Sequence, residues 1–268
     1  MKQNVAFGAT GSWSGTGPDR ERHIYSRKIK GNRMVTIQID GKKVKAAEGS
    51  TILEKAEELN IQIPTMCHHA YLSPFGACRL CTVEVKQKGK WQLAASCTTP
   101  VAEGLEIRTA SDTVKESRKL AATLLYRNHP GTEAVRKMAA SLGVEVAQEK
   151  GEDNDCILCG LCVRTCREIV GVNALTFEDR GPGRKVDEPK ILFDPGACIG
   201  CGSCVVACPT GHIQMEEDLD RRIIWEKVFK MTPCDDCGRY FAPEDQLTWI
   251  SAKTGVPFSE LTTCVSCR

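Results

Sequence analysis

Sixteen cysteines in this 268-residue chain are spaced in patterns that suit metal binding. Twelve of them stand in Cys-x-x-Cys steps, where two neighbouring thiols reach a shared metal more easily than they reach distant disulfide partners. Disulfides therefore do not explain the cysteines, and the expected compartment is a reducing one. The chemistry that the spacing favours is ligation of soft metal ions by thiolates.

Two stretches repeat the spacing Cys-x2-Cys-x2-Cys-x3-Cys. Bacterial ferredoxins bind two [4Fe-4S] clusters with this spacing, and the fourth cysteine of each run ligates the other cluster. All-thiolate zinc sites are the alternative, but they usually pair Cys-x2-Cys steps from separated segments. The pattern predicts one cluster on Cys156, Cys159, Cys162 and Cys208, and a second on Cys198, Cys201, Cys204 and Cys166.

Glycines stand between these cysteines. Gly160, Gly200 and Gly202 have no side chain, so backbone N–H groups can approach the cluster sulfides. Pro209 follows the last cysteine and is expected to turn the chain away.

A third set of four cysteines precedes the two runs. Plant-type ferredoxins bind a [2Fe-2S] cluster with Cys-x4-Cys-x2-Cys and a distant fourth cysteine. The first gap is ten residues here, and the order is otherwise the same. The sequence predicts a [2Fe-2S] site on Cys67, Cys78, Cys81 and Cys97, with Gly76 allowing the loop to fold against the cluster.

Three polar residues lie close to this set. Arg79 could donate a hydrogen bond to the cluster, or it could be a solvated surface residue. His68 and His69 follow Cys67, and imidazole replaces thiolate in Rieske centres. Since four cysteines already suffice, we expect these histidines to surround the site or to be exposed.

The last four cysteines flank a small apolar segment. Two separated Cys-x2-Cys steps around such a segment are typical of a zinc ribbon or treble clef, and zinc would fold a tail too short for a core of its own. A further [4Fe-4S] cluster and a redox dithiol are the alternatives. The predicted zinc ligands are Cys234, Cys237, Cys264 and Cys267, around Tyr240, Phe241, Leu247, Trp249, Ile250 and Phe258.

Simple patterns predict the elements that must position these residues. Alternating apolar residues around Asp40-Gly41 predict one hairpin, and a turn at residues 88–90 predicts another. A helix is expected from Ser50 or Thr51 to Leu59.

Two further helices are expected before the first cysteine run. One begins at Ser111 or Asp112 and ends before Pro130, with an apolar stripe of Leu120, Leu124 and Leu125. A second one covers residues 132–142 and stops at Gly143.

Two stretches resemble a known family. Residues 63–84, with Cys67, Cys78 and Cys81, and residues 155–166 are similar to the N-terminal part of the large iron–sulfur subunit of respiratory complex I. They are equally similar to the diaphorase iron–sulfur subunit of NAD-reducing hydrogenases and to the accessory cluster domains of [FeFe] hydrogenases. The resemblance covers about residues 34–215.

The resemblance implies an α+β protein made of consecutive small domains. These are a β-grasp [2Fe-2S] ferredoxin domain, a helical connector and a ferredoxin-like domain with two [4Fe-4S] clusters. The last four cysteines, beyond the resemblance, add a small C-terminal metal-binding module. With a flexible arm that contains Trp13 and Tyr25, the expected ranges are 1–33, 34–110, 111–150, 151–218 and 219–268.

The chain departs from the family in the connector. The family has a further [4Fe-4S] site there, formed by a His-Pro pair and three cysteines. Asn128-His129-Pro130 is present, but Glu133, Arg136 and Leu142 stand where the cysteines would fall. We expect this cluster to be absent and His129 to be structural.

No motif for hydride transfer or other catalysis is found, and no residue is assigned a catalytic role. The resemblance implies a non-catalytic electron-transfer subunit of a multisubunit NAD(P)H-linked oxidoreductase, of the hydrogenase, formate dehydrogenase or bifurcating type. Its partners would be an NADH-oxidising flavoprotein and a terminal redox subunit, with a thioredoxin-like [2Fe-2S] subunit as a further candidate.

Three other functions are weighed against this one. The iron–sulfur subunit of a succinate dehydrogenase or fumarate reductase also joins a [2Fe-2S] domain to cluster-binding repeats. A free-standing ferredoxin-like carrier is the second. A zinc-organised structural or nucleic-acid-binding module would explain only the tail.

Charge and hydropathy bear on the possible partners and on the cellular location of the chain. The net charge of +2 gives no electrostatic case for nucleic acid as a partner. No apolar run approaches the roughly 18 residues of a membrane span, and the N-terminus has no apolar signal region. The expected location is the cytoplasm.

Overall fold

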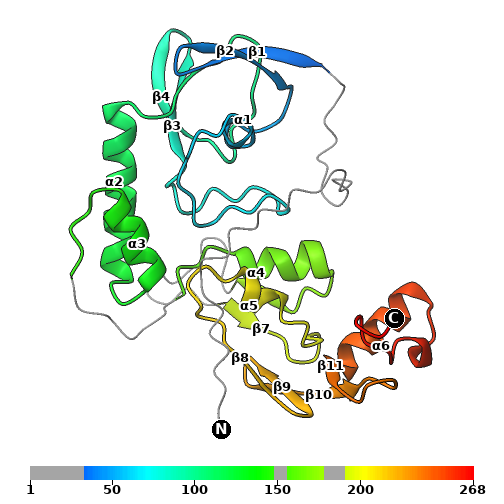
Figure 1. Cartoon of the computed structure of the whole chain (residues 1–268). Helices are drawn as coiled ribbons and strands as arrows, with labels where there is room; N and C mark the ends of the chain where they lie inside the picture. The colour runs from blue at the N-terminus through cyan, green and yellow to red at the C-terminus, as the bar shows by residue number, and fades with distance from the viewer. Residues whose placement is uncertain (1–32, 148–155, 178–190) are drawn as a thin grey trace.

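The computed structural model describes residues 33–147, 156–177 and 191–268, as a series of small units along the chain (Figure 1). The predicted N-terminal arm with Trp13 and Tyr25 lies outside the described residues, apart from Arg33. Among the described residues, no helix is both long and apolar enough to cross a membrane.

The first unit is a five-stranded sheet in the order β2-β1-β5-β3-β4. Strand β1 pairs antiparallel with β2 and parallel with β5, and β3 pairs antiparallel with both β4 and β5. Both predicted hairpins are present. The strands are β1 (Met34–Ile39), β2 (Lys42–Ala47), β3 (Thr82–Gln87), β4 (Lys90–Ala95) and β5 (Glu106–Arg108).

The two hairpin turns explain the register of the sheet. Asp40 and Gly41 have φ of 49° and 83°, and Lys88 and Gly89 have φ of 49° and 78°. Two central residues with positive φ form the turn whose twist matches paired strands. The sequence predicted both turns, but it did not indicate the short strand β5.

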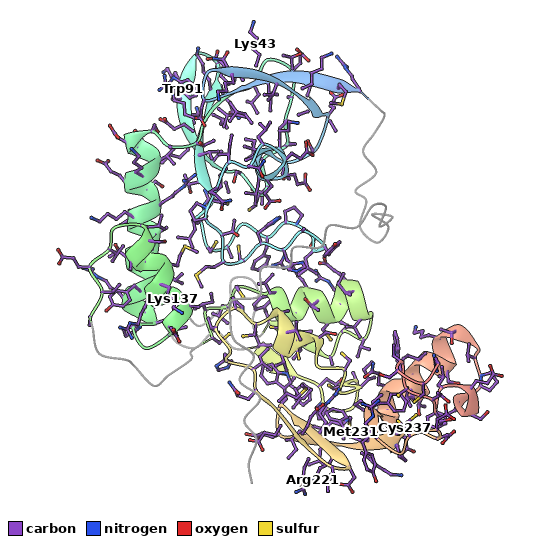
Figure 2. All side chains as sticks on the ribbon, in the orientation of Figure 1. Lys43, Trp91, Lys137, Arg221, Met231 and Cys237 are labelled. Atoms are coloured by element: carbon purple, nitrogen blue, oxygen red, sulfur yellow. The ribbon has the colours of Figure 1, made fainter. Side chains whose placement is uncertain are left out.

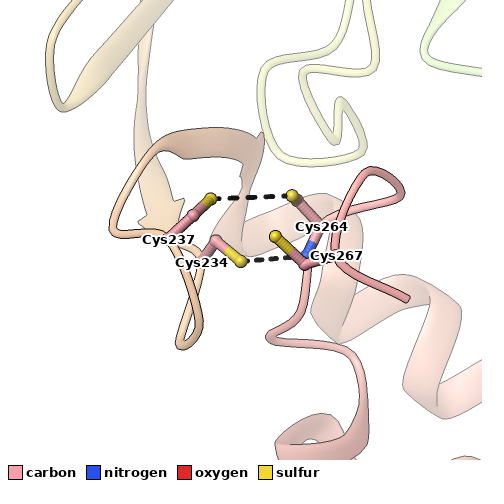
Figure 3. Close-up of side chains that lie close together, drawn as sticks. All are labelled: Cys234, Cys237, Cys264 and Cys267. Atoms are coloured by element: carbon pink, nitrogen blue, oxygen red, sulfur yellow. Dashed lines mark hydrogen bonds between the residues drawn. The ribbon is translucent and has the colours of Figure 1, made fainter.

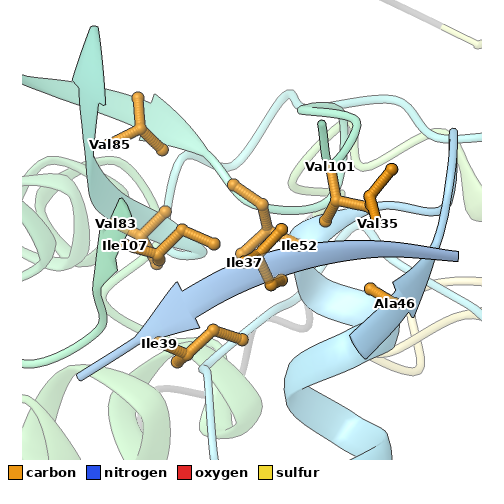
Figure 4. Packing of buried hydrophobic residues seen from close by; sticks show 9 residues of the cluster. All are labelled: Val35, Ile37, Ile39, Ala46, Ile52, Val83, Val85, Val101 and Ile107. Atoms are coloured by element: carbon orange, nitrogen blue, oxygen red, sulfur yellow. The ribbon is translucent and has the colours of Figure 1, made fainter. Parts of the chain in front are cut away.

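One face of the sheet packs on helix α1 (Ile52–Glu58) around a buried apolar core (Figure 4). The Thr51 side chain accepts from the N–H of Glu54, and the Glu54 carboxylate accepts from the N–H of Thr51. This capping box starts the helix at the predicted position. The core residues are Val35, Ile37, Ile39, Ala46, Ile52, Val83, Val85, Val101 and Ile107.

The connector consists of α2 (Asp112–Asn128) and α3 (Glu133–Ser141), which pack against each other. Ser111 caps α2 as predicted, because its hydroxyl accepts from the N–H of Val114. The predicted apolar stripe of α2 is wrong.

The face of α2 that is buried differs from the predicted one. Leu120 and Leu124 are 61% and 54% exposed, and only Leu125 packs inward. The buried residues are Val114, Arg118 and Ala122, because this face lies against β3, where Arg118 Nε donates to the carbonyl of Thr82 at 2.9 Å.

The cysteine-rich unit that follows has short elements. It contains α4 (Leu161–Arg164), a π-helical turn η1 (Thr165–Val170), the antiparallel pair β6 (Leu175–Phe177) and β7 (Ile191–Phe193), and α5 (Ser203–Ala207).

A four-stranded sheet in the order β11-β10-β9-β8 leads into the tail. Its central strand β10 pairs with β9 on one side and with β11 on the other. The cysteine-rich unit and the tail therefore share one sheet. The elements are β8 (Met215–Asp218), β9 (Arg221–Ile224), β10 (Lys227–Pro233), β11 (Tyr240–Pro243), α6 (Glu244–Thr254) and the 3-10 turn η2 (Phe258–Glu260).

Candidate metal centres

The structure brings the first four cysteines together between α1 and the hairpin of β3 and β4. The Sγ atoms of Cys67 and Cys78 lie 3.4 Å apart, and those of Cys81 and Cys97 lie 3.3 Å apart. Cys67, Cys81 and Cys97 are buried. The loop from Cys67 to Cys81 and the segment after β4 thus bring the four predicted [2Fe-2S] ligands together as two close thiol pairs.

Hydrogen bonds within the two thiol pairs favour deprotonation of one partner in each. The hydrogen bond between Cys67 and Cys78 lowers the pKa of Cys78 to about 6, and the one between Cys81 and Cys97 lowers the pKa of Cys81 to about 6. The same two bonds raise the pKa of Cys67 and of Cys97. Since iron binds the thiolate, one thiol of each pair favours the ligating form near neutral pH and its partner favours the protonated form.

The polar residues next to these cysteines, Arg79, His68 and His69, differ in how far they are buried. Arg79 is exposed, which agrees with a solvated side chain. His69 is exposed too, whereas His68 is half-buried and lies 3.9 Å from Glu57. Burial lowers the pKa of both histidines. The sulfur–sulfur contacts of this site involve the four cysteines and neither histidine.

Two cavities lie in the cysteine-rich unit, and each contains cysteines of both runs. We call the cavity of about 310 Å³ the first cavity and the one of about 380 Å³ the second; both volumes include space open to solvent. The first cavity is lined by Cys156, Cys159, Cys162 and Cys208. The second is lined by Cys198, Cys201, Cys204 and Cys166. These groups coincide with the crossed sets that the sequence predicted.

Burial and short polar contacts define both cavities. Burial raises the pKa of Cys159 and of Cys204 to about 11. The N–H of Ala174 donates to Cys166 Sγ at 3.2 Å, and Thr210 Oγ1 lies 3.5 Å from Cys208 Sγ. Backbone N–H groups directed at cluster sulfur are a known feature of iron–sulfur sites, so the surroundings fit such clusters.

The glycines between the ligands are required by both conformation and space. Gly160 and Gly200 have φ of 70° and 71°, which side chains rarely tolerate. A Cβ at Gly160 would lie 2.8 Å from Phe177 Cζ, and one at Gly200 would lie 2.7 Å from Phe229 Cγ. The predicted reason was access of N–H groups to sulfide; aromatic side chains that pack over the loops add a second reason.

Arg164 connects the loop of the predicted [2Fe-2S] cysteines to the first cavity. The sequence analysis did not single out this residue. It is only 2% exposed. Its Nη2 donates to the carbonyl of Cys67 at 2.6 Å, its Nη1 donates to the carbonyl of Ser73, and its Nε donates to the carbonyl of Gly160 at 3.2 Å. Its position between two predicted ligands, Cys162 and Cys166, is the sequence signal that could have drawn attention to it.

A second contact ties the same segments together. Glu168 of η1 accepts from the N–H of Ser73 at 2.8 Å and from its hydroxyl at 2.7 Å. The rings of Phe75 and Phe177 stack with centroids 5.8 Å apart. The loop that contains Cys67 and Cys78 is therefore fixed directly on the cysteine-rich unit.

The connector holds no thiol at the positions where the resembled family has its additional cluster. Arg136 Nη2 donates to the carbonyl of Ala147 at 2.7 Å, and the Tyr126 hydroxyl accepts from the N–H of the same residue at 2.8 Å. Leu142 packs in an apolar cluster with Val135 and Ala139. Hydrogen bonds and apolar packing between protein groups thus fill this part of the connector.

The last four cysteines form the tightest thiol group. The Sγ atoms of Cys234, Cys237, Cys264 and Cys267 all lie within 4.8 Å of one another (Figure 3). The Arg239 side chain lowers the pKa of Cys237 to about 6 by hydrogen bonding. Such a convergent group fits a tetrahedral metal ion. Figure 2 shows the side chains of the described residues and labels Cys237 on the C-terminal module.

Comparison with known proteins agrees with the geometry. Residues 32–112 match the family described as a 2Fe-2S iron-sulfur cluster binding domain. Residues 155–212 match a 4Fe-4S dicluster domain, and a second dicluster family matches residues 190–240. The chain is an iron–sulfur protein with ferredoxin-like [2Fe-2S] and [4Fe-4S] dicluster domains.

Its relatives belong to the group that the sequence resembled. The NADPH-Fe(3+) oxidoreductase subunit alpha of Geobacter sulfurreducens is 35% identical over 76% of this iron–sulfur chain and 27% of its own length. The NADP-reducing hydrogenase subunit HndD of Solidesulfovibrio fructosivorans is 30% identical over 73% of this chain and 37% of its own. The 78 kDa subunit of the mitochondrial NADH-ubiquinone oxidoreductase of Candida albicans is 28% identical over 72% of this chain and 30% of its own.

The resemblance is thereby confirmed, for a limited part of each relative. The chain spans 27% to 37% of the length of these three proteins. A chain of an NAD+-reducing [NiFe]-hydrogenase structure is 25% identical, with a TM-score of 0.48 over 59% of this chain and 74% of that chain. This structural likeness is too low to establish how the domains are arranged.

Proposed function

We propose that this chain is the iron–sulfur electron-transfer subunit of a multisubunit NAD(P)H-linked oxidoreductase. It would pass single electrons between an NADH-oxidising flavoprotein and a terminal redox subunit. The observation that supports this most strongly is the crossed lining of the two cavities, because each combines three cysteines of one run with the fourth of the other.

In this proposal the three thiol groups hold one [2Fe-2S] and two [4Fe-4S] clusters. The [2Fe-2S] ligands are Cys67, Cys78, Cys81 and Cys97. Bound clusters would supply one-electron transfer at potentials that the surrounding protein sets through burial, hydrogen bonds and charge. The chain contributes the thiolates, the buried cavities and the backbone donors, while Arg164 and Glu168 fix the two cluster regions against each other.

The C-terminal group of four thiols is proposed to bind zinc. Cys234 and Cys237 precede β11, Cys264 and Cys267 follow η2, and the apolar residues between them are few. A zinc ion would stabilise such a small module outright.

A further [4Fe-4S] cluster is the alternative at this position. The second dicluster family reaches residue 240 and so includes Cys234 and Cys237. In that case the tail would be an additional electron-transfer site instead of a structural module.

Metal analysis of the full chain, purified anaerobically, tests these assignments. We expect about ten irons, a matching amount of sulfide and about one zinc per chain, with EPR signals of three clusters after reduction. About fourteen irons without zinc would replace the zinc proposal by a third cubane. Iron near zero would overturn the electron-transfer proposal itself.

The partner proposal needs a separate measurement. NADH alone is expected to leave the visible spectrum of the oxidised chain unchanged, since the chain has no nucleotide-binding motif. Adding an NADH-oxidising flavoprotein subunit should bleach the cluster absorption. Reduction by NADH without any flavoprotein would contradict this proposal.

A further inference from the structure

Lys227 links the second cavity to the C-terminal module. Its Nζ donates to the carbonyl of Pro195 at 2.7 Å and to the carbonyl of Cys198 at 2.8 Å. The same Nζ lies 3.2 Å from the Asp245 carboxylate of α6. Cys198 lines the second cavity, so a cation held by the tail lies beside one of the predicted cluster ligands.

The shared strand β10 explains why this position is fixed. Lys227 begins β10, and the Lys227 ammonium lies 4.5 Å from the centroid of the Phe229 ring. Phe229 is 1% exposed and packs against Gly200, beside Cys198. The same strand pairs with β11 and ends one residue before Cys234. One strand thus runs from the second cavity to Cys234 of the C-terminal thiol group.

Other charged groups near this cavity are paired in a different way. Arg222 Nη1 donates to the carbonyl of Gly200 at 2.7 Å, and its Nε donates to Glu217 of the neighbouring strand β8 at 2.6 Å. Arg222 is therefore balanced within the cysteine-rich unit. Among the described residues, Lys227 donates to the carbonyl of Cys198 and Arg222 donates to that of Gly200. Of these two cations, Lys227 is the one whose carboxylate partner belongs to the C-terminal module.

The charge of Lys227 has a definite electrostatic effect. A cluster with four thiolate ligands is negatively charged, and reduction adds one more negative charge. A fixed positive charge stabilises the reduced form more than the oxidised form and so raises the reduction potential. Lys227 Nζ lies close enough to the ligand segment for this effect, since it donates to the carbonyl of Cys198 at 2.8 Å.

We propose that Lys227, held in place by Asp245, raises the reduction potential of the cluster at Cys166, Cys198, Cys201 and Cys204. The C-terminal module would then set the electron affinity of the nearest cubane in addition to being a folded metal site. This inference rests on the proposed cluster assignment. Lys227 and Asp245 are positioning residues here, since neither is a ligand.

An EPR-monitored redox titration of the anaerobic full chain tests the inference. In Lys227→Gln, we expect the reduced-to-oxidised ratio of this cubane at a fixed solution potential to fall about tenfold, equal to about 59 mV for a one-electron couple. Lys227→Arg keeps the charge and should restore the ratio. The cubane is identified as the one whose signal is lost in Cys201→Ala.

Lys230 provides a matched control. It lies on the same strand and pairs with Glu244 of the same helix at 3.0 Å, but its side chain is 78% exposed. Lys230→Gln removes one cation–carboxylate pair between β10 and α6 and should leave all cluster potentials unchanged. Equal shifts in Lys227→Gln and Lys230→Gln would overturn the inference, as would no shift in Lys227→Gln with all clusters present.

Asp245→Asn tests the contribution of the C-terminal module. This test remains valid even if the clusters fail to assemble in Lys227→Gln. Removing a nearby negative charge would by itself raise the potential. If Asp245 acts by holding Lys227, the potential should fall instead. An unchanged or higher potential would overturn the role of the module. A wild-type chain without cubane signals would refute the proposed function. Normal cubane signals whose potential does not change in Lys227→Gln would refute this inference alone.

Discussion

Gly200 lies between Cys198 and Cys201, and its missing side chain has two independent physical reasons. Its φ of 71° belongs to the left-handed region, which costs other residues about 1–2 kcal/mol. In addition, a Cβ would lie 2.7 Å from Phe229 Cγ, closer than side-chain atoms pack. Phe229 is buried and cannot move aside without opening the core beside the second cavity.

Gly200→Ala is therefore expected to disrupt the second cubane selectively. Iron content should fall from about ten to about six per chain, with loss of one [4Fe-4S] EPR signal. Gly238→Ala is the matched control, because Gly238 also has a positive φ of 69° but its Cβ would meet nothing within 4 Å. That variant should keep all ten irons. Full iron content in Gly200→Ala would contradict the steric argument.

At the level of elements, the two hairpins could be predicted because each depends on local chemistry. Alternation marks the strands, and the residues at Asp40-Gly41 and Lys88-Gly89 adopt the positive φ of the turns. The face of α2 could not be predicted in this way. Leu120 and Leu124 of the predicted stripe point to solvent, because the burial of α2 is decided by contact with β3 and α3, which periodicity does not reveal.

Substitutions on α2 separate the two faces. Leu120→Gln and Leu124→Gln lie on the exposed face and should change the free energy of unfolding by no more than about 0.5 kcal/mol each. Val114→Ala on the buried face of α2 removes buried methyl groups and should cost about 1–2 kcal/mol. The apparent Tm of the anaerobic protein, followed by circular dichroism, measures this order. A larger loss in the leucine variants would mean that they pack against something.

The C-terminal module is an element whose stability should depend on its metal. Its apolar cluster has three small or medium-sized buried members, Ala242, Leu247 and Leu261. Removing the proposed zinc with a chelator should raise the amide hydrogen-exchange rates of residues 234–268 strongly, since metal binding and folding are coupled in such small modules. The β1 and β2 hairpin is the internal control and should keep its protection. Unchanged exchange in the tail would show that the module folds without metal.

At the scale of the whole molecule, the sequence predicted which cysteines converge but not how the convergent sites are joined. Cysteine spacing reflects local loop geometry, and the structure places the sixteen thiols in two close pairs, two cavities and one group of four. Arg164 and Lys227 act between segments that are far apart in the sequence. Arg164 contacts a residue 97 positions away, and its place between two predicted ligands, the one local signal, does not reveal that contact.

Arg164 is the residue on which the joint between the [2Fe-2S] loop and the cysteine-rich unit most depends. Arg164→Gln would leave buried carbonyls of Cys67 and Ser73 without their donors, a loss on the order of 3 kcal/mol. Since 1.4 kcal/mol corresponds to tenfold, amides of the loop should exchange about 100-fold faster. The Ser73 amide, which donates to Glu168, is the most direct reporter.

Arg167→Gln distinguishes this joint from a general effect of charge in η1. The Arg167 side chain is 49% exposed and pairs only with Glu168 among the contacts described. Its loss should leave Ser73 protected, because Glu168 still accepts both Ser73 bonds. If both variants exposed the loop equally, the shared factor would be Glu168, not Arg164. Fast exchange confined to Arg164→Gln would assign the joint to the buried guanidinium and its three carbonyl acceptors.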